Sequence, residues 1–170
     1  PGRDILRLVP LGSDSALIFT ATALYLATPQ LVRELDLRGT PIWAPSPRSV
    51  ERRAPPVYFY DVCRSPSGDL WLIGFFKKLV RFRPDHTILK RCLSGKSRPV
   101  PATLFTVIAD GHFKSLAGTP AHALVVVTDF SGNLSYLTKD QHLIWKSFAQ
   151  TDIDTAAIDQ LGRVWVEVCP

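Results

Sequence analysis

The segment Leu-Val-Arg-Phe-Arg-Pro-Asp at residues 79–85 decides the fold, because its pattern returns along the chain. Residues 134–140, Leu-Ser-Tyr-Leu-Thr-Lys-Asp, again run from alternating apolar positions into a polar turn ending in Asp, at an offset of 55 residues. The same offset backwards reaches Leu-Tyr-Leu-Ala-Thr-Pro at residues 24–29, where Pro29 falls opposite Pro84. A fixed step of this size indicates a repeat architecture.

Each copy of the repeat lies among other short apolar segments. Alternation over five to eight residues, bounded by Gly, Pro, Asp and Ser, is typical of half-buried strands. The predicted neighbouring strands are residues 16–20, 70–74 and 123–128 before the repeat, 31–37, 87–93 and 142–148 after it, and lead strands over 5–11, 57–64, 104–109 and 153–159. The chain is thus predicted to hold three four-stranded units and a fourth that stops after a second strand at residues 164–168.

A second recurring pattern marks where one strand of a unit gives way to the next. Gly-Asp-Leu-Trp-Leu at residues 68–72 matches Gly-Arg-Val-Trp-Val at residues 162–166. We expect the Gly to take a left-handed turn position, which costs a residue without a Cβ nothing. We expect Trp71 and Trp165 to pack between neighbouring sheets.

On these residues the chain resembles the blades of the NHL-repeat, streptogramin-lyase-like and two-component-regulator propellers. Residues 123–129, running through Gly-Asn-Leu at 132–134, are similar to the strand and turn of the NHL repeat. The resemblance covers most of the chain. It implies an all-β fold of antiparallel four-stranded β-propeller blades, about three and a half of them. The 55-residue step is longer than the roughly 40–50 residues usual for such blades, and Gly74 stands where the third unit has Asp129.

The predicted units span residues 4–40, 56–95, 102–150 and 151–170, with a Pro-rich inter-blade loop over 39–56. Residues 111–120 are interpreted as a bulged insertion in the third unit. A propeller ring needs at least four blades, so three and a half do not close. We therefore expect further blades of the same chain, a second copy or a protein partner to complete the ring. Otherwise the last hairpin would expose an aliphatic, Trp-bearing edge.

No catalytic or metal motif is recognisable in the sequence. There is no Gly-x-Ser-x-Gly, P-loop or paired-acid signature. A catalytic His needs a positioned partner, and none is evident for the four histidines. Asp152 and Asp154 lack the further ligands of a calcium loop. We therefore expect a non-catalytic protein without cofactor or metal. A propeller enzyme of the lyase or lactonase type is the alternative that the resemblance suggests.

The middle third of the chain is basic. Residues 48–98 contain twelve Lys or Arg against four acids, although the whole chain carries only +5. Basic side chains on phosphates and aromatic rings on bases are how proteins hold single-stranded nucleic acid. An RNA-binding face is therefore one alternative function, and its candidate residues are Lys77, Lys78, Arg81, Arg83, Lys90 and Arg91. The simpler interpretation is the solvated side of ordinary strands.

The leading hypothesis is a binding or scaffold module that presents propeller loops to a protein partner. The candidate contact is the Pro-rich loop, with Trp43 as an anchor beside Arg48, Arg52 and Arg53. An exposed Trp on a loop can anchor an interface. A Trp folded back onto its own blade is the other interpretation.

The three cysteines, Cys63, Cys92 and Cys169, are widely spaced and odd in number, which does not fit a zinc site. We expect reduced cysteines in strands of a cytoplasmic protein, with one disulfide as the alternative. Apolar runs fall short of the roughly 20 residues that cross a bilayer, so no membrane contact is expected.

Overall fold

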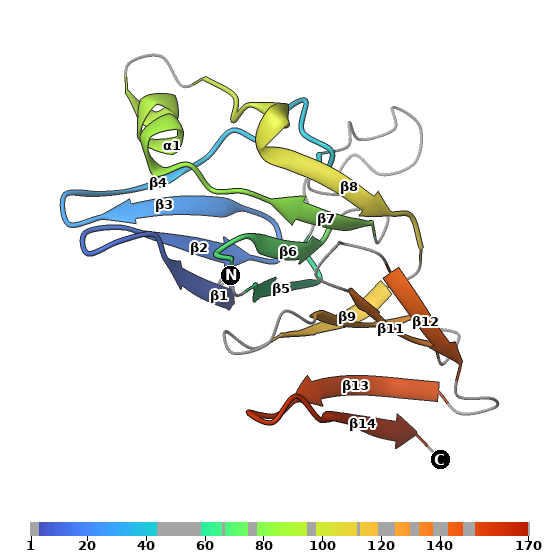
Figure 1. The fold of residues 1–170 in the computed structure, drawn as a ribbon. Helices are drawn as coiled ribbons and strands as arrows, with labels where there is room; N and C mark the ends of the chain where they lie inside the picture. The colour runs from blue at the N-terminus through green and yellow to red at the C-terminus, as the bar shows by residue number, and fades with distance from the viewer. Residues whose placement is uncertain are drawn as a thin grey trace.

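Three four-stranded antiparallel sheets and one two-stranded sheet make up the described part of the computed structural model (Figure 1). The structure describes residues 4–43, 59–65, 67–74, 78–94, 98–111, 113–118, 125–129, 133–137, 143–147 and 152–169. In each sheet, strands pair in sequence order with their neighbours. The predicted fold class, antiparallel four-stranded blades numbering about three and a half, is confirmed.

The first sheet contains β1 (Ile5–Pro10), β2 (Ala16–Thr20), β3 (Leu24–Thr28) and β4 (Leu31–Glu34). Leu17 of β2 pairs with Leu26 of β3, and Phe19 pairs with Leu24. Because side chains alternate along a strand, these four lie on one face, and all four are fully buried. The period-two pattern read from the sequence therefore selects the face that enters the core.

The second sheet contains β5 (Asp61–Arg64), β6 (Leu70–Ile73), β7 (Leu79–Phe82) and β8 (Phe105–Ala109). Two expectations fail here. Residues 87–93, predicted as a strand, belong to helix α1 (His86–Leu93), and the strand predicted over 104–109 joins the second sheet as its fourth strand instead of leading the third unit. The second sheet still has four strands, because β8 takes the place of the strand predicted over 87–93.

The helix has a local cause that the alternation pattern conceals. Asp85 is its N-cap, and the carboxylate accepts a hydrogen bond from the Ile88 N–H at 2.8 Å, which satisfies one of the helix's unpaired N–H groups. Leu89, Cys92 and Leu93 are the buried residues of α1, and this i, i+3, i+4 spacing is helical. In eight residues, that spacing is hard to tell from strand alternation.

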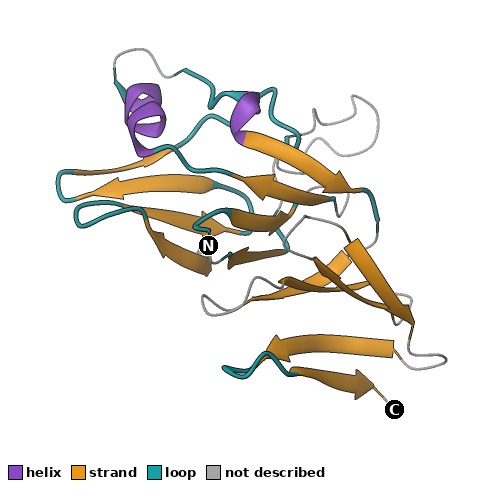
Figure 2. Cartoon of the chain, viewed as in Figure 1, coloured by secondary structure: helices purple, strands orange, loops and turns teal. Residues whose placement is uncertain are grey.

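The third sheet contains β9 (Phe113–Gly118), β10 (Val125–Asp129), β11 (Asn133–Leu137) and β12 (Leu143–Ser147), and the fourth contains β13 (Asp152–Ile158) and β14 (Val164–Cys169). The bulged insertion predicted over 111–120 is wrong, because this range holds β9, the first strand of the third sheet. The irregularity lies instead in the β9–β10 register, between Thr128 and Asp129. Figure 2 shows the sheets as successive layers.

Each pair of neighbouring sheets encloses its own apolar cluster. Val62, Leu72 and Phe82 of the second sheet pack with the core of the first sheet. From the opposite face, Trp71 and Ile73 pack with Phe113 and Leu116 of the third sheet. A further cluster joins the third sheet to the fourth, through Val126, Leu134, Ile153 and Ala156.

The first strands of successive sheets are also cross-linked by hydrogen bonds. The Arg7 Nε donates to the carbonyl oxygen of Val62 at 3.0 Å, joining β1 to β5. The Leu116 N–H donates to Asp61 Oδ2 at 2.7 Å, joining β5 to β9, and the Lys114 ammonium donates to the Ile153 carbonyl at 3.4 Å, joining β9 to β13. These first strands therefore lie side by side in sequence order, as the innermost strands of propeller blades do.

The two copies of the Gly-x-aliphatic-Trp pattern share one turn geometry. Gly68 has φ 88° and Gly162 has φ 79°, the left-handed region that glycine adopts without strain. The Gly68 N–H donates to the Ser65 carbonyl at 3.0 Å, and the Gly162 N–H donates to the Asp159 carbonyl at 3.0 Å. The predicted role of these glycines is confirmed.

The two tryptophans of the pattern have different surroundings. Trp71 is 4% exposed and packs between the second and third sheets, as predicted. Trp165 is 59% exposed, so the same prediction is wrong for it. Its neighbour Val166 packs toward the third sheet, which turns Trp165 to the opposite face by strand alternation. Trp165 instead lies near Arg163, 5.5 Å from the guanidinium, and donates to Asp159 at 3.2 Å.

Truncating the two tryptophans should separate their roles. Trp71→Ala is expected to lower the free energy of unfolding by about 3–5 kcal/mol, because it opens a cavity between two sheets. Trp165→Ala should cost about 1 kcal/mol or less, since the ring is exposed. Urea unfolding followed by circular dichroism measures both, with Trp71→Phe as a milder truncation that keeps an aromatic ring and should cost less than Trp71→Ala. Equal losses would contradict this placement.

Candidate binding pocket beside the inserted helix

Helix α1 is inserted between the third and fourth strands of the second sheet, whereas a short turn at residues 29–30 joins the third and fourth strands of the first sheet. Polar contacts with the first sheet fix its position. The Ser15 hydroxyl lies 2.8 Å from His86 Nε2, the Lys90 ammonium lies 3.3 Å from Asp14, and Arg33 donates to the Leu93 carbonyl at 3.0 Å. The buried residues of α1 join the core between the first two sheets. These contacts hold α1 against the first sheet, so the helix can form one side of a cavity.

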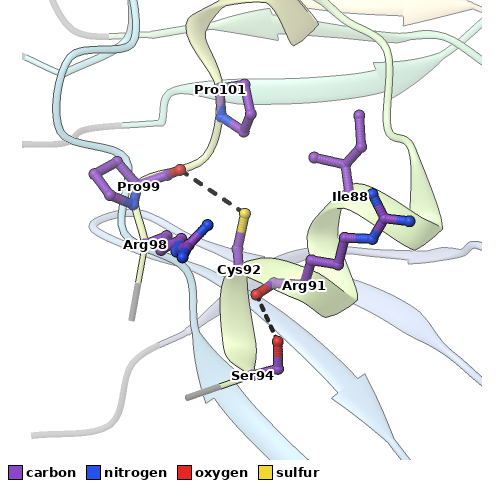
Figure 3. Close-up of a pocket in the computed structure, with 7 residues that line it drawn as sticks. All are labelled: Ile88, Arg91, Cys92, Ser94, Arg98, Pro99 and Pro101. Carbon is purple, nitrogen blue, oxygen red and sulfur yellow. Dashed lines mark hydrogen bonds between the residues drawn. The ribbon is translucent and has the colours of Figure 1, made fainter. Parts of the chain in front are cut away.

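A cavity of about 590 Å³ lies between the C-terminal half of α1 and the chain segment that returns toward β8. It is lined by Ile88, Arg91, Cys92, Ser94, Arg98, Pro99 and Pro101. Figure 3 shows Arg91 projecting from the helix and Arg98 from the returning segment, on either side of Cys92. The volume is within the range of small-molecule and peptide side-chain pockets, about 300–1,000 Å³.

Backbone hydrogen bonds hold the returning segment in place. The Arg98 N–H donates to the Cys92 carbonyl at 3.3 Å, and the Val100 N–H donates to the Asp36 carbonyl at 2.7 Å. The Ser94 hydroxyl donates to the Arg91 carbonyl at 2.9 Å, and so satisfies a carbonyl at the helix end. Arg91 and Arg98 are thus presented from two anchored pieces of backbone.

The pocket is basic on its rim and apolar on its walls. None of the seven described lining residues is acidic, and Arg91 and Arg98 are both exposed. Burial raises the pKa of the Cys92 thiol, while the Arg98 guanidinium opposes that shift. The thiol, 5% exposed, lies 3.8 Å from the Pro99 carbonyl and acts as a weak donor to it. Cys92 is therefore part of the pocket wall.

The basic residues selected from the sequence do not form one stripe in the structure. Lys78 pairs with Asp110 at 3.2 Å, Arg83 pairs with Asp69 at 3.4 Å, and Lys90 pairs with Asp14 at 3.3 Å. Arg81 is buried against the third sheet and lies 3.9 Å from Asp69. Arg91 alone among the described candidates lines the pocket, and Lys77 lies outside the described residues. The sequence did not predict that Arg91 and Arg98 line the same cavity, because this depends on the path of the chain after the helix.

Trp43 is half-buried and packs against the core between the first two sheets. The backbone N–H of Trp43 donates to the Thr40 carbonyl at 3.1 Å. Trp43 also borders a smaller cavity of about 330 Å³, together with Leu35, Leu37 and Arg38. Of the two interpretations drawn from the sequence, the Trp folded onto its own blade is the one present. Arg48, Arg52 and Arg53 lie outside the described residues.

A third cavity, about 210 Å³, lies where β1, β5 and β9 approach one another. Arg7, Cys63 and Arg64 line it, with Gly118 of β9. Burial, followed by the neighbouring Asp61 charge, raises the pKa of Cys63 to about 12. Burial also raises the pKa of Asp61, although N–H donors from Leu116 and Val62 work against the shift. Within the described ranges no three His, Cys, Asp or Glu side chains gather as metal ligands.

Cys63 and Cys92 are free thiols, the first in a strand as expected and the second in the helix. The side chain of Cys169 lies outside those that the structure describes. The described helices include none with the length and apolar character needed to cross a membrane.

Thiol labelling should follow these surroundings. At about pH 8, Cys63 in the folded protein is expected to resist iodoacetamide, because its pKa near 12 leaves almost no thiolate. Mass spectrometry of proteolytic fragments, before and after unfolding in urea, measures the difference. Modification of Cys63 at the unfolded rate in the folded protein would contradict its burial.

Searches with the sequence matched no protein-family model and no curated protein. Solved structures do match. Virginiamycin B lyase from Staphylococcus aureus aligns at a TM-score of 0.56 and 13% identity, over 98% of this chain and 49% of the lyase. A catalytically inactive variant of that lyase with quinupristin aligns at 0.53 and 12%, over 97% and 49%. Regucalcin from Agrobacterium tumefaciens, a calcium-binding protein, aligns at 0.53 and 14%, over 94% and 51%.

The prediction that the protein is not an enzyme, drawn from absent motifs, is contradicted by this likeness. Two of the matched structures are of a lyase, so the architecture is one that supports catalysis, and missing local motifs do not argue against it. The chain spans about half the length of the structures it matches. At these identities the likeness concerns the fold, and it confirms that the chain has the architecture of propeller blades.

Proposed function

We propose that this chain is a protein-binding module of propeller type, in which the pocket beside α1 takes an acidic segment of a partner protein. The observation that carries the proposal is that Arg91 and Arg98 line the same cavity, and that the described lining of this cavity contains no acidic residue. The partner contact predicted from the sequence was the loop over residues 39–56. The proposed contact moves it to the insertion between β7 and β8.

The chemistry of the lining suits carboxylates on a peptide. A guanidinium presents its N–H groups as a planar fork, which matches the two oxygens of a carboxylate. Ile88, Pro99 and Pro101 supply apolar surface between the two charges. An acidic peptide with an aliphatic side chain between its carboxylates would use both features. Loop insertions on a fixed scaffold are also where binding residues concentrate.

The same lining disfavours single-stranded RNA. Nucleic-acid grooves combine cations with aromatic rings on which bases stack, and the described lining contains no aromatic residue. Among the other described basic candidates, Lys78, Arg83 and Lys90 are paired with carboxylates. The described lining thus contains two cations, Arg91 and Arg98, which is enough for two carboxylates and short of a phosphate track.

Charge reversal in the pocket tests the proposal. A fluorescein-labelled peptide of alternating Glu and Leu should bind at low salt, and its Gln-and-Leu analogue should bind much more weakly. Arg91→Glu together with Arg98→Glu is expected to weaken the Glu peptide by about tenfold or more, because two charge-assisted contacts become repulsive. Fluorescence anisotropy gives both dissociation constants.

Arg163→Glu and Lys78→Glu together provide the control, since they make the same change of charge at surface ion pairs outside the pocket lining. Equal weakening by the control pair would point to net charge alone and would contradict the proposal. So would binding of a single-stranded RNA oligonucleotide that depends on Arg91 and Arg98, when the acidic peptide does not bind.

A second protein contact is supported by the fourth sheet, and here the occupant we propose is a second copy of the chain. β13 and β14 form a pair where the other sheets have four strands, and two-stranded sheets are marginal alone. Trp165, Val164 and Leu161 are exposed there. The matched structures are about twice as long, so two copies supply a comparable amount of propeller sheet.

Self-association should therefore depend on Trp165. Light scattering is expected to give a dimer mass at high protein concentration, and Trp165→Lys should shift it to monomer. Val107→Lys, which replaces an exposed aliphatic residue on β8 at the outer edge of the second sheet, should leave the dimer intact. A monomer whose amides in residues 152–169 exchange rapidly with solvent would overturn this second proposal.

A further inference from the structure

Four buried polar atoms have no hydrogen-bond partner in the described structure: Trp71 Nε1, Arg81 Nε, Arg81 Nη1 and Ser135 Oγ. Trp71 is 4% exposed, the Arg81 side chain 10%, and Ser135 is fully buried. Native proteins leave few buried polar groups unpaired, and an unseen water or ion is a common reason for those that remain. Each of these atoms is therefore a group that a bound water or ion could satisfy.

Strand pairing places Trp71 and Arg81 on the same face of the second sheet. Trp71 of β6 is directly paired with Cys63 of β5 and with Arg81 of β7, and paired residues project from the same face. Cys63 and Trp71 pack against the third sheet. The Arg81 side chain therefore also faces the third sheet.

Ser135 faces the same interface from the other side. It pairs with Val127, which pairs with Leu116, and Leu116 packs against the second sheet. Its neighbour Leu134 packs toward the fourth sheet, as strand alternation requires. All four unpartnered atoms thus lie in the layer between the second and third sheets, which Figure 1 shows as neighbours.

Among the described residues, one carboxylate lies beside two arginines at this end of the interface. Asp69 is the carboxylate recorded beside Arg81, at 3.9 Å from Nε, and it is also 3.4 Å from Arg83 Nε. Two guanidinium groups share one carboxylate. Arg81 carries a positive charge, and a buried charge without compensation is costly. Three of the four atoms are nitrogens that can only donate, so the matching ligand is an acceptor with negative charge.

We infer that the interface between the second and third sheets binds a small inorganic anion of chloride size, held by Arg81, Trp71 and Ser135. An ordered water would satisfy the hydrogen bonds but would add no negative charge, so Asp69 would remain the shared counter-ion of both Arg81 and Arg83. The bound anion would join β6 and β7 to β11, so it would act as a stabilising link between two blades. This site is separate from the pocket beside α1.

Anion-dependent stability tests the inference. Replacing sodium chloride by sodium gluconate at constant ionic strength should lower the melting temperature by about 3–6 °C, because a large organic anion cannot enter a closed interface and stabilisation by the bound ion is lost. Arg81→Gln should remove this difference between the two salts. Arg163→Gln, which changes an exposed arginine of the last hairpin, should retain it.

Two further measurements keep the inference testable if Arg81→Gln does not fold. Trp71→Phe removes one donor while keeping a ring, and should reduce the difference between chloride and gluconate. Crystals grown in sodium bromide should show an anomalous peak within hydrogen-bonding distance of Arg81 Nε and Trp71 Nε1. Melting temperatures that are the same in both salts, or a water without anomalous signal at that place, would overturn the inference.

Discussion

The architecture depends on one constraint: the second and third sheets bear buried apolar side chains on both faces, so each of them is covered on two sides. The second sheet shows this most fully. Leu72 and Val80 pack toward the first sheet, whereas Trp71 and Leu79, one residue before each of them, pack toward the third. A strand buried on both faces carries little polar surface, and every residue of β6 and β7 is buried. Burial on both faces therefore requires the sheets to stack against one another. Hydrogen bonds of Arg7, Asp61 and Lys114 join the innermost strands of this stack.

The same constraint explains where the molecule departs from regular stacking. The fourth sheet is covered on one side by the third, and its other face leaves Trp165 exposed at the position where Trp71 is buried. Exposed apolar faces of this kind mark interaction sites more often than they mark inert surface. The outer part of the second sheet departs differently, because α1 replaces a short turn and creates a cavity between itself and the returning chain. Both proposed protein contacts lie at such departures.

Buried polar groups add a second level of organisation to the apolar stack. Asp61 is desolvated, yet it accepts N–H donors from Val62 and Leu116, so its burial joins two sheets. Arg81 is buried with fewer partners, and its charge is shared with Arg83 over Asp69. An apolar residue at position 81 would fill the interface without placing a charge there that needs a counter-charge. This buried charge distinguishes the interface between the second and third sheets from the one between the first and second, where aliphatic and aromatic side chains predominate.

The sequence alone determined most of the strands and the turn glycines, because period-two alternation and positive φ at Gly68 and Gly162 are local properties. It did not determine α1, since eight residues carry too little periodicity to separate a helix from a strand and Asp85 acts only as a cap. Tertiary structure also decided which sheet β8 joins, that Arg91 meets Arg98, and that Arg81 is buried while Lys78 is paired at the surface. These outcomes depend on contacts between residues distant in the chain, and a single sequence encodes such contacts only through the packing of the whole.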